Sequence, residues 1–350
     1  MSQPFFTIGV TTYNRPDLLR QTLASVLSQS FGDFEVIVGN DYTAEHLTGD
    51  NLGIDDPRVR YVNHPSNLKE IGNMNALLGM GRGRYFTWLA DDDLYAPNFL
   101  ESIHDALIRF DCPPCAFSSY EMLYGDASPI HGECHSGGEK PLTGRQFLRE
   151  YFNGRLKLIG TYGVFETGTL RMLGGMEELC DSGVGLYGEY YLLAKCGLIE
   201  KILYVNAPLV KYRAHEGSWS GTNLEIDLYR RTGNELLRRC AGIFSHPSLR
   251  EDLGENLLAV CRLHLRSFYS KVALDAAAAP RGEGSLLDAL GCADAEAAAI
   301  RRSFYQLAGD AIGITFGIRL ACLRYRHRAI LVLLIIYRKL KSIFRVRGER

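Results

Sequence analysis

The sequence predicts an α/β protein with a mostly parallel central sheet flanked by helices, followed by an α-helical C-terminal region. Three observations predict this fold class. Short apolar runs alternate with helical patterns in the first part of the chain, as in right-handed βαβ units. Polar residues follow the ends of these runs, where open α/β sheets bind ligands. After Ser220 the pattern is helical throughout.

Length and composition are ordinary for a soluble protein. The 350 residues are 46% hydrophobic and 23% charged, with a formal net charge of −1. This balance gives no reason to expect nucleic acid as a partner. Nine irregularly spaced cysteines in a chain too long to need disulfides, and an N-terminus that begins no signal peptide, favour a cytoplasmic setting.

The first half of the chain contains four predicted strands, at residues 5–10, 34–39, 59–62 and 85–90. Between them, Pro16 and Asp17 are typical of a helix start, and apolar spacing predicts a helix through Gln29. A second helix is expected at about 71–78. Because parallel strands end at one edge of the sheet, we expect the polar residues after them to lie close together.

Three consecutive aspartates, Asp91 to Asp93, follow the fourth strand directly. Carboxylates at such a strand end are well placed to hold a hard divalent cation, which takes oxygen ligands and commonly also binds substrate phosphates. The alternative is a polar loop in which Asp91 or Asp93 caps the helix that follows Pro97.

The second half continues the α/β pattern. Thr143 and Gln146 have the spacing of a capping box that opens a helix to about Phe152. The other predicted elements are a helix at 98–110, a strand at 116–120, a helix within 185–198, and strands at 202–205 and 209–212.

Six ordered blocks carry a resemblance to a known family. They are Thr11-Thr12-Tyr13-Asn14-Arg15, residues 28–41, the aspartate cluster, Leu173-Gly174-Gly175-Met176, Glu189-Tyr190-Tyr191-Leu192 and Tyr212-Arg213-Ala214-His215. From about Phe5 to Ser220 the chain resembles inverting glycosyltransferases of family 2, which have the GT-A fold with a Rossmann-like sheet.

The resemblance implies a nucleotide site at the strand ends. It assigns Thr11 and Asp41 to the uracil or a related base and its ribose, with Tyr13 lining the pocket and Arg15 in the same block. Lys69 falls where the family often has a basic residue near the base or diphosphate. The alternatives are a helix cap for Thr11, a turn residue for Asp41 and a solvated side chain for Lys69.

The resemblance also implies a Mn²⁺ or Mg²⁺ ion. Asp92 matches the metal-contacting aspartate, and Asp91 is expected near the sugar or ribose. Asp93 would support the turn or a metal-bound water, and His215 would be a further ligand. Ala90 stands where the family usually has the first acid of the cluster, so the division of labour among these carboxylates is open.

Glu189 matches the position of the catalytic base in the family, where an aspartate is usual. Gly188 precedes it, where an acid is common. Glutamate can perform the same proton transfer, and Asp181 is the reserve candidate. The alternative is an acid that stabilises the first turn of a helix without any part in catalysis.

We expect a GT-A domain at residues 1–222, with a nucleotide-binding half at 1–112 and an acceptor half at 113–222, and a helical region at 223–350. From Arg319 to Arg350 there are ten Lys and Arg residues against one acid. The apolar run in the tail is too short to span a bilayer. A basic amphipathic helix at 329–350 is suited to a membrane surface, or to docking on the protein or on a second copy in a homo-oligomer.

These features predict a metal-dependent, inverting transfer of a sugar from a nucleotide-sugar, UDP-sugar first, to an acceptor hydroxyl. A glycan or lipid-linked acceptor in bacterial cell-surface glycan synthesis, at the inner face of the cytoplasmic membrane, fits the basic tail. One alternative is a sugar-1-phosphate nucleotidyltransferase, although residues 11–15 contain no glycine for a phosphate loop. The other is a catalytically inactive, membrane-peripheral scaffold with the same fold.

Overall fold

The computed structural model describes residues 3–124, 138–181, 183, 185–214, 225–278 and 286–308, together with 319, 322, 326 and 328–332 of the tail. The chain divides into two compact units, Met1–Thr222 and Asn223–Arg350. Each unit is described by itself below.

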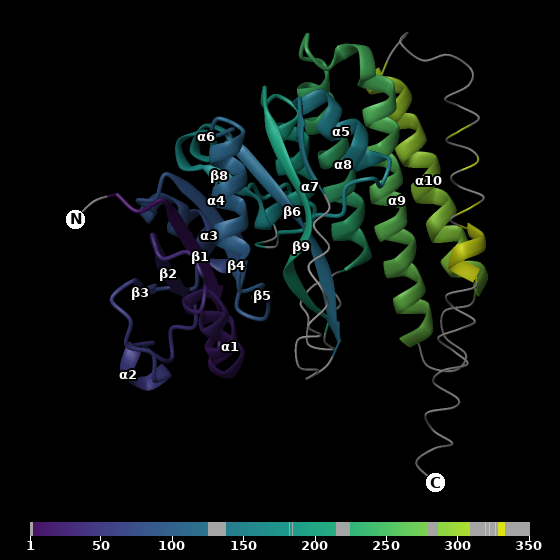
Figure 1. The fold of residues 1–350 in the computed structure, drawn as a ribbon. Helices are drawn as coiled ribbons and strands as arrows, with labels where there is room; N and C mark the ends of the chain where they lie inside the picture. Colours follow the sequence, from purple (N-terminus) through teal and green to yellow (C-terminus); the bar gives the residue numbers. More distant parts are fainter. Residues whose placement is uncertain are drawn as a thin grey trace. The chain divides into compact units, whose positions relative to one another are not determined.

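In the described part of the first unit, nine strands form one mixed sheet (Figure 1). They are β1 (Phe6–Thr12), β2 (Phe34–Asn40), β3 (Val59–Asn63), β4 (Tyr85–Ala90), β5 (Leu94–Tyr95), β6 (Cys115–Tyr124), β7 (Glu139–Leu142), β8 (Val164–Glu166) and β9 (Ile202–Ala214). The order is β3-β2-β1-β4-β8-β6-β9-β5, and β7 pairs with β9. The pairs among β1 to β4 and the β6–β9 pair are parallel, whereas β5, β7 and β8 pair antiparallel. The predicted mostly parallel sheet is confirmed.

The helices of this unit are α1 (Pro16–Leu27), α2 (Gly49–Leu52), α3 (Lys69–Met80), α4 (Phe99–Arg109), α5 (Gly144–Phe152), α6 (Thr167–Met172) and α7 (Gly188–Cys196), with a short 3₁₀ turn η1 (Gly160–Tyr162). The capping box of α5 is confirmed, because Thr143 and Gln146 exchange both of its hydrogen bonds. At α4 the cap position is Asn98. The capping role considered for Asp91 or Asp93 is therefore wrong.

One predicted interruption is absent. The strands expected at 202–205 and 209–212 form the single strand β9, which continues along β6 to Ala214. The register shifts on both sides of Ser119, so an irregularity in the ladder accommodates Pro208 without ending the strand.

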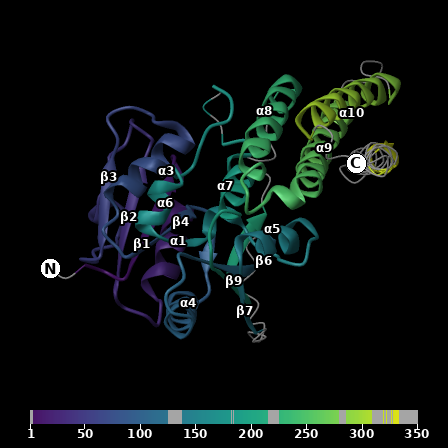
Figure 2. The same ribbon diagram turned by 90° about the horizontal axis from the view of Figure 1, so that it is seen from above.

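Helices cover both faces of the β1–β4 part of the sheet (Figure 2). Alternate residues of β1, such as Ile8, lie in one apolar core with residues of α1 and α4. On the other face, a Cβ at Gly39 would lie 2.1 Å from Oδ1 of Asn73, so the glycine allows α3 to approach β2 closely. Asn73 in turn donates to the carbonyl of Gly39 at 2.9 Å. This close contact positions the start of α3 beside the end of β2.

A buried carboxylate on β2, Glu35, links three segments at the amino-terminal edge of the sheet. It accepts hydrogen bonds from Thr7 Oγ1 at 2.8 Å and from Arg82 Nη2 at 2.6 Å. Burial opposes ionisation of Glu35, but the bonds from Arg82 and Thr7 outweigh it, and its pKa lies below the ordinary value. The ionised form therefore stabilises the fold above the ordinary pKa of glutamate, and this contribution is lost as the pH falls through the folded-state pKa.

We expect Arg82→Ala to lower the free energy of unfolding by about 1 to 2 kcal/mol, because a buried acceptor loses its charged partner while water reaches part of the vacated space. The loss should be largest near neutral pH and shrink in acid. Urea unfolding at pH 7 and pH 4 measures it. Arg60→Ala, which removes an exposed arginine bound to the carbonyl of Met80, is the control. Equal losses in the two variants would contradict the assigned role of Glu35.

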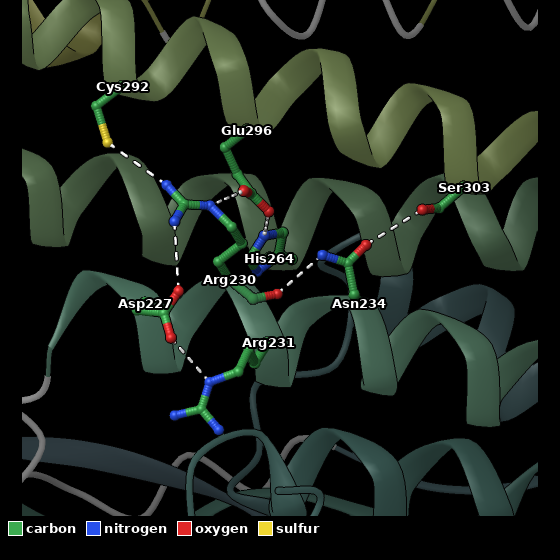
Figure 3. A network of polar contacts seen from close by, with 8 residues as sticks. All are labelled: Asp227, Arg230, Arg231, Asn234, His264, Cys292, Glu296 and Ser303. Atoms are coloured by element: carbon green, nitrogen blue, oxygen red, sulfur yellow. Dashed lines mark hydrogen bonds and ion pairs between the residues drawn. The ribbon is translucent and has the colours of Figure 1, made fainter.

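The second unit is helical in its described part, with α8 (Ile226–Phe244), a 3₁₀ turn η3 (Arg250–Asp252), α9 (Leu253–Ala278) and α10 (Leu286–Ala308). A buried polar network joins its three long helices (Figure 3). Glu296 is fully buried, and it binds His264 Nε2 at 2.8 Å and Arg230 Nε at 3.0 Å. Charged and hydrogen-bonded partners make burial of this carboxylate tolerable, and the network specifies how the helices pack.

The tail is described only in part. Residues 328–332 are helical, Arg328 pairs with Asp294 of α10 at 3.3 Å, and Leu331 is fully buried. The start of the tail therefore packs on the helical unit, while residues 333–350 of the expected amphipathic helix lie outside the described part. None of the described helices combines the length and hydropathy needed to cross a bilayer.

The eight described cysteines are free, and Cys112 and Cys115 are among them.

Candidate active site

The carboxyl ends of β1, β2 and β4 meet at one edge of the sheet. Thr11 of β1 is in register with Gly39 of β2 and with Ala90 of β4. Thr12 Oγ1 donates to Asp91 Oδ2 at 2.7 Å, and the main-chain N–H of Asp41 donates to the carbonyl of Thr12 at 3.1 Å. The polar residues that follow three separate strands thus lie together, as the alternating pattern predicts.

Asp91 is a buried member of this edge. Besides Thr12, the main-chain N–H of Tyr13 donates to it. Burial raises the pKa of Asp91 to about 6, the bond from Thr12 lowers it, and the neighbouring Asp92 raises it. The hydroxyl of Thr22 in α1 donates hydrogen bonds to the main-chain carbonyls of Asp91 and Asp93, at 2.9 Å each. The turn after β4 is therefore fixed by β1 and α1.

Asp93 is held from two other elements. The main-chain N–H of Arg213 in β9 donates to its Oδ1 at 2.7 Å, and the hydroxyl of Tyr162 in η1 donates to its Oδ2. Burial raises the pKa of Asp93 to about 7, although both hydrogen bonds lower it. Because each carboxylate oxygen accepts a hydrogen bond, Asp93 is suited to supporting the turn, one of the two roles considered for it.

Asp92 is the aspartate of the cluster that reaches solvent most, with 15% of its side chain exposed. Its Oδ2 lies 2.9 Å from Nη1 of Arg15, which also lies 3.4 Å from Asp91 Oδ1. Arg213 Nε donates to the carbonyl of Asp92 at 2.8 Å and so fixes its backbone. The guanidinium of Arg15 thus compensates two of three adjacent carboxylates.

A divalent cation fits this arrangement in one particular way. No group of three His, Cys, Asp or Glu side chains placed to hold a metal occurs in the described ranges, and His215 lies outside them. Mg²⁺, however, is commonly bound by one or two carboxylates together with substrate phosphates rather than by a cage of protein ligands. Asp92, partly exposed beside Arg15, would meet that requirement once a diphosphate supplies the remaining oxygens.

The other predicted nucleotide residues lie at the same edge. Asp41 is buried and accepts the N–H of Leu68 at 2.6 Å, directly before α3. Lys69 is exposed and has φ of 62°, a left-handed conformation that is uncommon for lysine and is often found at functional sites. Tyr13 is 52% exposed and contacts Tyr42 edge to face at 5.4 Å.

Glu189 is the second residue of α7 and is half-buried. Its Oε1 accepts the main-chain N–H of Gly160 in η1 at 2.8 Å. Burial raises the pKa of Glu189, the bond from Gly160 lowers it, and the carboxylate of Glu70 raises it further. A base with a raised pKa holds a proton more strongly than an ordinary glutamate. The reserve candidate Asp181 is exposed.

The η1 turn connects the two halves of the site. Its first residue, Gly160, binds Glu189, and its last residue, Tyr162, binds Asp93. On the opposite side, Asp41 holds the start of α3, and the N–H of Gly185 donates to Glu70 Oε2 at 3.1 Å. Hydrogen bonds, together with the short chain segments between the bonded residues, thus link Asp41 and the start of α3 to the loop before α7, and link Glu189 through η1 to the aspartate turn.

Aromatic side chains gather in the second part of this unit, and one of them, Tyr151, is near Glu189. Tyr120 of β6 and Tyr212 of β9 contact each other edge to face, with ring centroids 6.3 Å apart, and Nζ of Lys157 lies 4.8 Å from the Tyr120 ring centroid. Burial raises the pKa of Tyr151, and the nearby Glu189 carboxylate raises it further. These half-buried rings are suited to stacking on a sugar.

Two contributors to this site, Glu70 and Tyr162, are absent from the sequence-based prediction, and two others, Thr12 and Arg213, appear there without a role of their own. Glu70 shows no pattern that separates it from other acids in the first turn of a helix, and Tyr162 lies in an apolar stretch. Arg213 belongs to one of the matched blocks, and the clustering of polar residues after Thr11 already included Thr12. Only the contacts described above give these four residues their roles.

Comparisons with known proteins bear on the family and the fold. The family model "Glycosyl transferase family 2" matches residues 7–119. An uncharacterized glycosyltransferase of Rickettsia prowazekii is 30% identical over 246 residues, which are 67% of this chain and 72% of that protein. Another, from Rickettsia felis, is 29% identical over 126 residues, and the match covers 34% of this chain and only 20% of that longer protein.

Among solved structures, residues 1–349 of S. aureus TarS superpose with a TM-score of 0.57 at 15% identity, covering 99% of this chain and 92% of that one. The same protein in complex with UDP-GlcNAc gives a TM-score of 0.51 at 12% identity, covering 87% and 90%. At these identities the similarity is evidence for the fold alone. Together with the Rickettsia relatives and the matched family model, it leads to one conclusion: the chain belongs to glycosyltransferase family 2 and has the GT-A fold.

Proposed function

We propose that this protein transfers a sugar from a nucleotide-sugar donor to an acceptor hydroxyl, with inversion at the anomeric carbon. The observation that supports the proposal is the set of hydrogen bonds that links Asp41, the aspartate turn and Glu189 through the start of α3 and η1. A binding module needs no carboxylate of raised pKa opposite an anion site, whereas a transferase needs a base there.

The donor would lie along the ends of β1, β2 and β4. A carboxylate accepts the imide N–H of uracil, so Asp41, with Thr11 beside it, is suited to the base and ribose of a UDP-sugar. Tyr13 is exposed at the same edge and would line the base pocket. Arg15 and Lys69 would meet the diphosphate, and Asp91 would lie near the ribose or sugar. A TarS structure with UDP-GlcNAc supports this class of donor.

A bound Mn²⁺ or Mg²⁺ would neutralise charge on the departing nucleoside diphosphate. Asp92 would hold that ion, with Asp93 fixing the turn and His215 as the proposed further ligand. Arg15 already contacts Asp92 through its guanidinium, so it can pass to the diphosphate as the donor enters. Arg213 keeps the Asp92 backbone in place throughout.

Glu189 would act as the general base. Its carboxylate takes the proton of the acceptor hydroxyl as that oxygen attacks the anomeric carbon from the face opposite the nucleotide. Gly160 orients one carboxylate oxygen, which leaves the other for the acceptor. Because tyrosine rings can stack on a sugar, we assign a glycan or lipid-linked sugar as the acceptor. We further assign the enzyme to bacterial cell-surface glycan synthesis. The basic residues at 329–350 would bring the enzyme to the inner membrane surface.

Binding of the donor class is testable without an acceptor. With Mn²⁺ present, we expect UDP-sugars to raise the melting temperature more than GDP- or dTDP-sugars do, since a ligand at 100 times its Kd stabilises the native state by about 2.7 kcal/mol. The measurement is a thermal-shift screen of the full chain. A larger shift with GDP-sugars would contradict the uridine assignment, and no shift with any donor would contradict the proposed function.

The products separate the proposal from its rivals. A glycosyltransferase releases a nucleoside diphosphate, and slow hydrolysis of the donor in water releases the same product. A sugar-1-phosphate nucleotidyltransferase would release pyrophosphate when given a nucleoside triphosphate. Absence of all three reactions, with donor binding intact, would favour the inactive scaffold.

A further inference from the structure

We propose that Glu70 is a positioning residue for Glu189, resting on the function proposed above. Its carboxylate anchors the loop that leads into α7, and its negative charge makes Glu189 the more effective proton acceptor. The two glutamates come from parts of the chain that are far apart in sequence, since Glu70 and Gly185 are separated by 115 positions.

The first step is the anchor. Glu70 Oε2 accepts the N–H of Gly185 at 3.1 Å, and the carbonyl of Gly185 then accepts the N–H of Gly188, the first residue of α7, at 3.0 Å. A Cβ at Gly185 would lie only 2.7 Å from Glu70 Oε2, so the loop backbone is close against this carboxylate. Two hydrogen bonds thus connect Glu70 to the residue that precedes Glu189.

The conformation at the helix start adds to this constraint. Tyr187 is buried with φ of 63°, and Gly183 has φ of 73° close to the side chain of Lys69. A non-glycine residue held in the left-handed region persists only where surrounding contacts determine it. The start of α3, at Lys69 and Glu70, therefore contacts and constrains the loop that precedes Glu189.

The second step is electrostatic. The N–H of Gly160 in η1 donates to the Glu189 carboxylate, and Tyr151 of α5 and Glu70 of α3 interact with it electrostatically. The other charged side chain of α7, Lys195, donates through Nζ to Glu177 Oε1 at 2.7 Å and to the carbonyl of Leu173 at 2.5 Å. A like charge opposes ionisation of its neighbour, so Glu70 favours the protonated form of Glu189.

Glu70 is itself subject to the same environment. Its side chain is exposed, yet crowding by the surrounding protein raises its pKa, and the bond from Gly185 partly offsets this effect. The charge on Glu70 in turn opposes ionisation of Glu189. An anchor alone would need no charge, because a glutamine oxygen accepts the same N–H.

This difference gives the test. Glu70→Gln keeps an acceptor for Gly185 but removes the charge. In protein labelled with ¹³C at the glutamate carboxyl carbons, with the Glu189 signal identified by its loss in Glu189→Gln, we expect the Glu189 titration midpoint to move to lower pH in Glu70→Gln. With UDP-GlcNAc as the probe donor, the acid limb of the donor-hydrolysis profile should move in the same direction.

Glu178→Gln is the matched control, because Glu178 also accepts a main-chain N–H of this loop, from Gly183. It should leave the Glu189 midpoint unchanged. An unchanged midpoint in Glu70→Gln, or an equal shift in the control, would overturn the proposal. The NMR measurement needs no turnover, so a wild-type protein that neither transfers nor hydrolyses any donor would contradict the proposed function while the Glu70 proposal is still decided.

Discussion

Replacing Glu189 with glutamine should lower the rate of sugar transfer by about 10²- to 10⁴-fold, the range that a general base commonly contributes. Glutamine retains an oxygen for the N–H of Gly160, so the local hydrogen bond survives while the proton acceptor is lost. The variant should therefore fold normally and bind the donor as wild type does. Steady-state transfer assays and donor-induced thermal shifts measure the two expectations separately.

The matched control for this variant is Asp181→Asn. Asp181 is exposed, whereas Glu189 is half-buried and bound to η1. We expect nearly wild-type transfer in the control. If Glu189→Gln turned over at a normal rate while Asp181→Asn lost activity, Asp181 would be the base, and Glu189 would be a first-turn acid that stabilises α7.

Asp92→Ala should also reduce transfer strongly, by about 10²- to 10³-fold, comparable to removing one preorganised group that stabilises developing charge. The expected cause is weaker retention of the divalent ion beside the diphosphate. The fold should remain intact because Arg15 keeps Asp91 as a partner, and the turn is still held by Thr22 and by the N–H of Arg213. Transfer rates over a Mn²⁺ titration, with the donor saturating, should show a higher metal requirement in the variant.

An exposed aspartate on the neighbouring helix provides the control. Asp17 pairs with Arg20 on the surface of α1, with 89% of its side chain exposed, so Asp17→Ala should leave the metal titration unchanged. A wild-type enzyme that transfers at full rate in a chelator would remove the metal from the proposal. In that case Arg15 and Lys69 would be the charges that stabilise the departing diphosphate.

The two variants report different parts of one site. Glu189 is bound at the beginning of η1 and Asp93 at its end, so loss of this turn would move the base and the aspartate turn together. Activity effects of residues that act as a unit are not additive. The double variant Glu189→Gln/Asp92→Ala should therefore lose less than the product of the single losses.

Local pattern was sufficient for the secondary structure that carries the site. The run of β-favouring residues before Asp91, the proline at the start of α1 and the Thr143 capping box each concern contacts within a few residues. The polar residues after β1, β2 and β4 could be placed together because parallel strands share an edge. Pattern was insufficient at Pro208, where pairing with the long strand β6 outweighed the local tendency of proline to end a strand.

What the sequence by itself determined is therefore the order of elements, the family resemblance and the edge at which the chemistry is expected. Only the tertiary structure decided the surroundings of each carboxylate: Asp93 is held by Tyr162 and by Arg213, 120 positions away, while Asp92 is partly exposed beside Arg15. The same holds for Glu70 and its loop. The physical reason is that these roles depend on burial and on partners that folding brings near. The spacing of neighbouring residues in the sequence determines neither of them.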